Sequence, residues 1–146
     1  MFLLDVNVLI ALCDESHEFC YYAREWFVKH RASGWATCPL TENGMIRIMS
    51  HSAYGSGTTT PDIARSLLRI LTQDPQHVFI PDDISICDVI HFSDLKTITS
   101  KIVTDLYLIR LARHHRMRLA TFDGHMARRE KALSSELTFI ETSQPR

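Results

Sequence analysis

The chain has 146 residues, of which 45% are hydrophobic and 23% are charged. These values are ordinary for one globular domain with a sizeable core, so we expect a single domain over residues 1–146. No apolar run approaches the roughly 18 residues that a membrane span requires, and we expect no membrane span. The N-terminus carries no basic region or signal-like cleavage pattern, which predicts a cytoplasmic protein.

Charge is unevenly distributed along the chain, although the net charge is only −1. Residues 1–95 contain six Lys/Arg and twelve Asp/Glu, whereas residues 96–146 contain ten Lys/Arg and five Asp/Glu. The basic excess of the C-terminal part suggests contact with a polyanion. A solvated helix face would produce the same excess.

The cysteines and histidines show no metal-binding spacing. The four cysteines form no C-x-x-C pair, and the eight histidines show neither H-x-H nor H-E-x-x-H spacing. Scattered thiols in a compact cytosolic domain are more often buried apolar residues than disulfides or zinc ligands. The sequence therefore predicts neither a disulfide framework nor a zinc site.

The first predicted elements place a carboxylate at a turn. Phe2–Leu4 is an apolar run with the length of a short buried strand, and Asn7 is a good N-cap that predicts a helix over residues 8–13. Asp5 lies on the turn between them. Ligands of open α/β sheets bind at the carboxyl ends of strands, so Asp5 is a candidate site residue. Turns also favour Asp for conformational reasons alone.

A similar arrangement follows in the next part of the chain. Aromatic residues at helical spacing predict an amphipathic helix within residues 14–33, and residues 35–38 are typical of a second short strand. Thr41 can cap the next helix, which is expected to end near residue 49. Glu42 then falls in the first helical turn, where the helix dipole favours an anion. It is either a helix-start residue or a second acid placed just after a strand.

The central part supplies one more strand but no nucleotide-binding motif. The loop over residues 51–61 is rich in Gly, Ser and Thr but lacks the G-x-x-x-x-G-K-[ST] pattern, so a P-loop is not supported. The predicted elements are a helix over 61–72, a strand over 78–80, a helix over 85–91 and an irregular connection over 92–102. Asp82 and Asp83 are expected to be capping or solvated residues.

Two further acids lie near predicted helix starts in the C-terminal part. Residues 103–115 are predicted to form a helix capped by Thr104, which puts Asp105 in its first turn. Asp123 follows an apolar run and can cap the next helix. The last predicted elements are a strand from residue 118 into the turn at 123, a helix over 125–131 and a strand over 137–140.

Strands that alternate with helices predict an α/β fold, with a parallel sheet covered by helices on both faces. Because parallel strands end at one edge of a sheet, four acids distant in sequence can converge there: Asp5, Glu42, Asp105 and Asp123. Clustered carboxylates repel one another and raise some of their pKa values, a penalty that a divalent cation removes. Oxygen ligands without Cys or His partners suit Mg²⁺ or Mn²⁺.

Four segments, in this order along the chain, resemble those of PIN-domain ribonucleases of the VapC toxin type, from bacterial toxin–antitoxin pairs. These segments are Leu4–Ile10, Pro39–Gly44, Val103–Leu108 and Leu119–Asp123. The resemblance implies a PIN-like three-layer α/β/α fold with a central five-stranded parallel sheet. It also implies a homodimer, a cognate antitoxin that blocks the site, and cleavage of structured RNA such as tRNA or rRNA.

The resemblance also assigns roles to individual residues. It makes Asp5, Glu42, Asp105 and Asp123 an acidic quartet, with Asn7 and Thr121 as polar support. The implied chemistry is metal-assisted phosphodiester hydrolysis. One or two Mg²⁺ would be held mainly by Asp5, Asp105 and Asp123, while Glu42 binds metal or orients the water. The candidate phosphate contacts are Arg113, Arg116, Arg118, Arg128 and Arg129. Arg128 and Arg129 follow Asp123 by about one helical turn and should lie nearest the site.

Three other classes of protein are compatible with part of the pattern. A phosphatase of the haloacid dehalogenase type needs a second Asp two residues after the first, where this chain has Asn7. A receiver domain needs an acid pair near the first strand and a Lys on the last, and residues 137–142 contain no Lys. The third alternative is a catalytically idle PIN fold that only binds RNA or protein. A metal titration would distinguish it from the enzyme.

Overall fold

A five-stranded parallel sheet lies at the centre of the part of the chain that the structure describes. The structure is a computed structural model, and it describes residues 1–55, 59–93, 95, 99–124 and 137–142. The strands are β1 (Phe2–Leu4), β2 (Trp35–Thr37), β3 (His77–Phe79), β4 (Arg118–Thr121) and β5 (Leu137–Phe139). They lie in the order β3-β2-β1-β4-β5, and every neighbouring pair is parallel.

This strand order reverses direction at β1. The chain passes from β1 outward to β2 and β3, and then returns to place β4 on the other side of β1. In open α/β sheets, ligands bind in the crevice outside the carboxyl ends of the strands at such a reversal. The topology therefore directs attention to the turns that follow β1 and β4.

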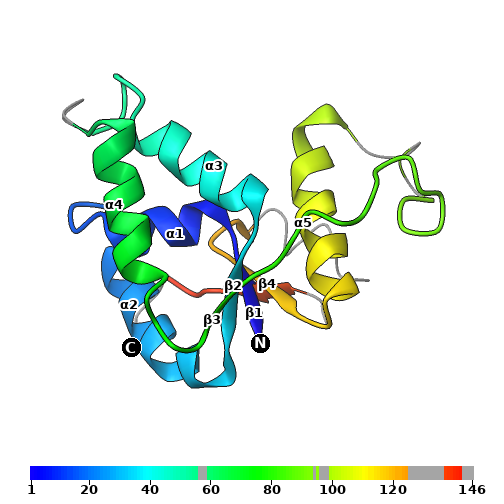
Figure 1. Ribbon diagram of the computed structural model, residues 1–146, viewed down its shortest axis with the longest axis horizontal. Coiled ribbons are helices and arrows are strands. Elements are labelled where there is room, and N and C mark those ends of the chain that lie inside the picture. The colour runs from blue at the N-terminus through cyan, green and yellow to red at the C-terminus, as the bar shows by residue number, and fades with distance from the viewer. Residues whose placement is uncertain (56–58, 94, 96–98, 125–136, 143–146) are drawn as a thin grey trace.

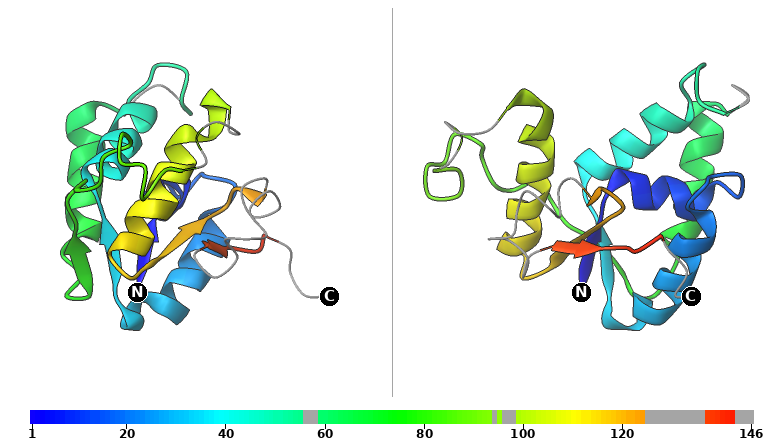
Figure 2. Two further views of the ribbon diagram at one scale, coloured as in Figure 1. Left: turned by 90° about the vertical axis from the view of Figure 1, so that its right-hand side faces the viewer. Right: turned by 180° about the vertical axis from the view of Figure 1, so that it is seen from behind.

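Helices cover both faces of the sheet. They are α1 (Val6–Cys13), α2 (Cys20–His30), α3 (Pro39–Met49), α4 (Pro61–Leu71) and α5 (Val103–His114), with short 3-10 helices η1 (Arg31–Ser33) and η3 (Ser100–Ile102). Helices α1 to α4 lie on one side of the strands and α5 on the other (Figure 1), and the views in Figure 2 show the same separation. The predicted three-layer α/β/α fold is confirmed. None of the helices in the described ranges is long and apolar enough to cross a membrane.

Each face of the sheet has its own apolar core. Successive side chains of a strand point to opposite faces. Accordingly, Leu3 and Leu119 pack in the core beneath α5, whereas Leu4 and Ala120 pack in the core beneath α1 to α4. All four are fully buried, so the central strands are apolar on both faces, as expected for a parallel sheet between two helical layers.

Two helices begin earlier than predicted, and a third has a different cap from the one predicted. Asp5, not Asn7, is the N-cap of α1, because its carboxylate accepts a hydrogen bond from the backbone N–H of Val6. Helix α3 begins at Pro39, which has no N–H to leave unpaired. Helix α5 begins at Val103 and follows η3 directly, so Thr104 lies inside the helix and is not its cap.

The predicted helix over residues 85–91 is wrong. This stretch consists of turns, in which polar side chains hydrogen-bond to the local backbone. The Ser85 hydroxyl accepts from the N–H of Cys87, and the Asp88 carboxylate accepts from the N–H of Ile90. Such bonds compete with those of a helix. The predicted helix over 125–131 lies outside the described residues.

Helices α1 and α3 approach closely at Gly44. A Cβ atom added at Gly44 would lie 2.7 Å from Cγ2 of Val6. The Val6 side chain is β-branched and has little rotational freedom in a helix, so it cannot easily move aside. Glycine at this position lets α3 pack directly against the first turn of α1, the turn that Asp5 caps.

We expect Gly44→Ala to destabilise the protein. Overpacking costs about 1–3 kcal/mol, which exceeds the roughly 1 kcal/mol that Ala gains over Gly inside a helix. Urea denaturation should show a lower midpoint for this variant. Adding Val6→Ala removes the colliding methyl groups and should recover part of the loss. A single Gly44→Ala variant as stable as the parent would contradict the close approach.

Candidate functional site

The Asp5 carboxylate is fixed at the junction of β1, α1 and β4. Its Oδ1 accepts a hydrogen bond of 2.7 Å from the backbone N–H of Val6, which caps α1. Its Oδ2 accepts a 2.7 Å hydrogen bond from the Thr121 hydroxyl at the end of β4. The residue is only 8% exposed. Each oxygen has two lone pairs, so these two bonds leave acceptor capacity on both oxygens for another ligand.

Thr121 is the centre of a small polar network. Its hydroxyl oxygen donates to Asp5 and accepts hydrogen bonds from the Asn7 amide at 3.1 Å and from the backbone N–H of Asp123 at 3.0 Å. The Asn7 side-chain oxygen accepts in turn from the N–H of Phe122 at 3.3 Å. These bonds, in which Asn7 and Thr121 take part, tie the turn after β1 to the turn after β4.

Neighbouring aspartates raise the pKa values of Asp5 and Asp105. Burial raises the pKa of Asp5, hydrogen bonds from Thr121 and Val6 lower it, and the charge of Asp123 raises it again. Burial is also the main cause that raises the pKa of Asp105, to about 6, with the charges of Asp5 and Asp123 adding to it. Asp105 lies in the first turn of α5. Residues from the turn after β1, the start of α5 and the turn after β4 therefore act on one region of space.

This donor set fits a divalent cation. The raised pKa of Asp105 reflects burial together with repulsion between carboxylates, and a cation placed among them would relieve the repulsion. The donors are carboxylate oxygens, which suit Mg²⁺ or Mn²⁺ better than Zn²⁺ or Cu²⁺. Asp5, Asp105 and Asp123 are the residues that could hold such an ion.

Glu42 is positioned through a different set of contacts. The Thr37 hydroxyl, at the end of β2, donates a 2.6 Å hydrogen bond to Oε1 of Glu42. The same hydroxyl oxygen lies 2.8 Å from Nε2 of His77 on β3. Because the single hydroxyl proton goes to Glu42, His77 must donate its Nε2–H to Thr37. Burial lowers the pKa of His77 while the charges of Glu42 and Asp74 oppose that effect, which favours the neutral imidazole that this arrangement needs.

Thr37 and His77 were not predicted from the sequence. Thr37 is fully buried and ends its strand just as Thr121 ends β4, and each threonine donates its hydroxyl proton to an acid. A threonine at a strand end, a few residues from an acid, is the signal that could have identified Thr37. No local pattern points to His77, because its bond to Thr37 spans 40 positions of the chain.

The predicted arginines are distributed unevenly around the sheet. Arg118 begins β4 and donates to the backbone oxygen of Leu137 at 2.8 Å, so it supports the β4–β5 pair at the strand starts. Arg113 lies in the last turn of α5 and Arg116 in the turn that follows. At 1.5 Å per residue, both are roughly 12–16 Å along the chain from Asp105. Arg128 and Arg129 lie outside the described residues.

Comparison with known proteins agrees with this fold. Residues 2–132 match the PIN domain family. The chain is 41% identical over 126 residues to Ribonuclease VapC39 of Mycobacterium tuberculosis (strain ATCC 25618 / H37Rv), which covers 86% of this chain and 90% of the relative. Ribonuclease VapC38 of the same strain is 40% identical over 125 residues, or 85% of this chain and 86% of the relative. Ribonuclease VapC44 of that strain is 38% identical over 125 residues, or 86% of this chain and 87% of the relative. The chain therefore belongs to the PIN domain family, as a ribonuclease of the VapC type.

Proposed function

We propose that this protein is a Mg²⁺-dependent endoribonuclease toxin of a type II toxin–antitoxin pair, which hydrolyses phosphodiester bonds of a structured RNA, tRNA or rRNA. Mn²⁺ should be able to substitute for Mg²⁺. The effect of neighbouring carboxylates on the pKa values of Asp5 and Asp105 carries the proposal, because a divalent cation would relieve the repulsion between these groups. The ribonuclease names of the relatives support the reaction class.

Each residue of the site has a distinct task in this proposal. Asp5, Asp105 and Asp123 bind the cation, which would stabilise the attacking and leaving oxygens of the phosphodiester. Glu42 binds the cation as well or orients the attacking water, and the Thr37 hydroxyl fixes its carboxylate. The Thr121 hydroxyl and the Asn7 amide hold Asp5 and the turn at Asp123 in place, as groups behind metal ligands do.

The partners follow from the same proposal. RNA would approach a region that carries carboxylates, so attraction must come from basic residues outside it. The basic excess of residues 96–146 supports this view, with Arg128 and Arg129, and less directly Arg113 and Arg116, as candidate contacts. We further propose a cytoplasmic homodimer that a cognate antitoxin of the VapB type inhibits by covering the acidic residues.

The first test removes one charge from the proposed metal site. We expect Asp5→Asn to lower RNA cleavage at least about 100-fold, because ligands of one metal act as a unit. Asn is as good an N-cap as Asp, so α1 should remain folded. Cleavage of a labelled RNA and circular dichroism would be measured together.

Asp62→Asn is the matched control for this test, since it removes an exposed acid from the first turn of α4. It should cleave RNA like the parent protein. Full cleavage by a folded Asp5→Asn protein would remove Asp5 from the metal site and favour a binding module without catalysis.

The second test uses the ionisation of Asp105. Its pKa is about 6 in the folded protein, above the ordinary aspartate value of 3.8. Between pH 3.8 and about pH 6 the Asp105 carboxyl is ionised in the unfolded state but still protonated in the folded state. The free energy of unfolding therefore decreases as pH rises through this range, and the full loss of stability is reached above about pH 6. Asp105→Asn removes the carboxylate and with it this loss of stability. Above pH 6 the metal-free variant should therefore be more stable than the parent by about 1 kcal/mol, a value reduced for solvent screening of a partly buried group.

Thermal melts of parent and Asp105→Asn protein, from about pH 4 to pH 8, measure this difference. Mg²⁺ should raise the melting temperature of the parent by mass action and that of the variant less. A stability difference that stays constant with pH, together with equal responses to Mg²⁺, would contradict the carboxylate site.

The third test concerns the position of Glu42. Thr37→Val keeps the shape and β-branching of the side chain but removes the hydroxyl that donates to Glu42. We expect cleavage to fall about 10-fold at saturating RNA, the effect typical of a group that orients a metal ligand. Thr37→Ser restores the hydroxyl and should restore the rate. Equal losses in both variants would indicate a packing role for Thr37.

A further inference from the structure

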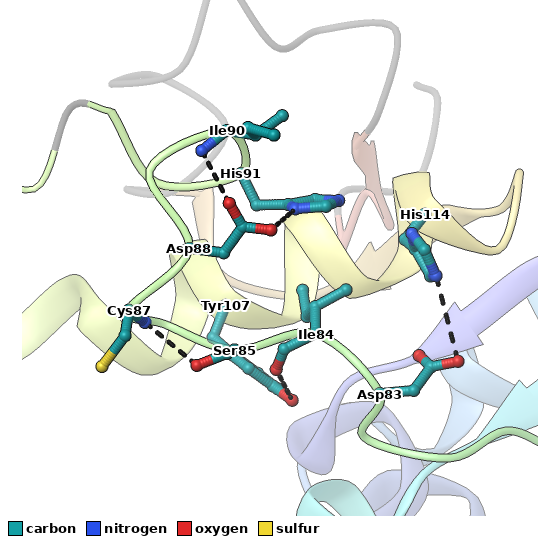
Figure 3. A network of polar contacts seen from close by, with 9 residues as sticks. All are labelled: Asp83, Ile84, Ser85, Cys87, Asp88, Ile90, His91, Tyr107 and His114. Atoms are coloured by element: carbon teal, nitrogen blue, oxygen red, sulfur yellow. Dashed lines mark hydrogen bonds and ion pairs between the residues drawn. The ribbon is translucent and has the colours of Figure 1, made fainter.

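Two histidines and an aspartate meet at the end of α5 that is remote from Asp105. Nε2 of His115 lies 2.8 Å from Oδ1 of Asp83, and Nε2 of His114 lies 3.9 Å from Oδ2 of the same carboxylate. One ligand atom from each residue lies within 4.8 Å of the other two. Figure 3 shows the Asp83 carboxylate and the His114 ring facing each other across the space between the chain segment after β3 and α5.

This group is separate from the acidic residues of the proposed active site. Asp105 lies in the first turn of α5, and His114 is its last residue. At 1.5 Å per residue, the two positions are about 14 Å apart along the helix axis. A metal bound at Asp83, His114 and His115 would therefore neither touch Asp105 nor share a ligand with it.

The segment that carries Asp83 is anchored against α5. Ile80 and Ile84, on either side of Asp83, are buried in the core beneath α5. The Tyr107 hydroxyl donates a 3.3 Å hydrogen bond to the backbone oxygen of Ile84 (Figure 3). Asp83 thus projects from a fixed stretch of backbone toward the helix end, while its own side chain remains accessible to solvent.

A tight turn fixes the two histidines. Arg116 adopts a left-handed conformation, with φ of 58°, directly after His115. The N–H of Met117 bonds to the oxygen of Ala112 at 2.7 Å, and the Met117 side chain is buried. This arrangement closes the helix with a left-handed residue, as many helices do. Both imidazoles consequently leave the helix where it ends, next to Asp83.

We propose that Asp83, His114 and His115 form a zinc site that fastens the segment after β3 to the C-terminal end of α5. Ligand atoms 2.0–2.1 Å from a tetrahedral Zn²⁺ lie about 3.3 Å from one another. Nε2 of His115 lies 2.8 Å from Oδ1 of Asp83, Nε2 of His114 lies 3.9 Å from Oδ2, and all three groups have a ligand atom within 4.8 Å of the others, so side-chain movement would bring them to one ion. Two imidazoles and one carboxylate select Zn²⁺ over Mg²⁺ and leave the fourth position for water.

A simple ion pair would account for the same contacts. An exposed ion pair contributes little to stability and needs no metal, so the response of the protein to Zn²⁺ separates the two interpretations.

His91 supplies a matched control. Its ring lies 5.5 Å from the ring of His114, but its Nδ1 contacts Oδ2 of Asp88 at 2.9 Å. The side chain is thus a neighbouring histidine outside the proposed ligand set. Replacing it changes the histidine content of the same region while leaving all three proposed ligands in place.

The experiment uses metal-free, tag-free protein carrying Asp5→Asn, so that the acidic site contributes less to binding. Calorimetric titration with ZnCl₂ should show a single Zn²⁺ site, and thermal melts should show a higher melting temperature with Zn²⁺. The double variant His114→Ala/His115→Ala should lose both effects, and Asp83→Asn should weaken binding at least about 10-fold. His91→Ala should bind like the parent, and excess Mg²⁺ should not compete.

Several outcomes would overturn the proposal. The double variant could bind Zn²⁺ as the parent does, or His91→Ala could lose as much affinity as the double variant. A third such outcome is that each substitution changes the melting temperature by the same amount with Zn²⁺ as without it. In that case the three residues form only an ion pair. X-ray absorption at the zinc edge of the parent protein depends on no variant. It should show two imidazole nitrogens bound to the metal, and fewer than two would refute the site.

Discussion

The hydrogen bond between Thr121 and Asp5 joins the two central strands of the sheet at the point where strand order reverses. The same Asp5 carboxylate caps α1, so one side chain fixes the direction of a helix and presents oxygen atoms at the sheet edge. Burial opposes its ionisation, and the two hydrogen bonds favour it. The fold thus holds a costly charge in place through contacts that also define the start of α1.

Stability and the proposed activity depend on the same charges. The carboxyl groups of Asp5 and Asp105 are each raised in pKa by burial and by neighbouring acids, so the metal-free protein carries a local electrostatic penalty. Shifted pKa values of this kind are common at sites that bind an ion or a substrate. The Glu42 carboxylate has a separate support from β2 and β3, through its hydrogen bond with the Thr37 hydroxyl.

The sequence predicted the elements whose signals are local. All five strands and helices α1 to α5 were anticipated within a few residues, because apolar runs and helical periodicity depend on neighbours in the chain. Helix starts were less well predicted, since the capping residue depends on side-chain geometry, as Asp5 and Asn7 demonstrate. The false helix over 85–91 arose because the polar side chains of Ser85 and Asp88 bond to nearby backbone.

Contacts between residues far apart in the sequence were not predicted, because sequence patterns report only on neighbouring residues. The links from His77 to Thr37 and from Asp83 to His115 join positions 40 and 32 residues apart, and no motif search over local spacing would detect them. The absence of an H-x-H pattern led to the expectation of no zinc site. Adjacent histidines at a helix end can nevertheless meet a carboxylate that tertiary packing supplies.

The position of β1 in the middle of the sheet also has a consequence for synthesis on the ribosome. Strand β1 emerges before β4 and cannot complete its pairing until β4 appears, and the Asp5–Thr121 bond spans 116 positions. Pairings of such high sequence separation form late and slowly. A nascent chain in which Thr121 is still inside the exit tunnel therefore contains Asp5 without the hydroxyl that orients it, and the contacts around Asp5 form only after Thr121 has left the tunnel.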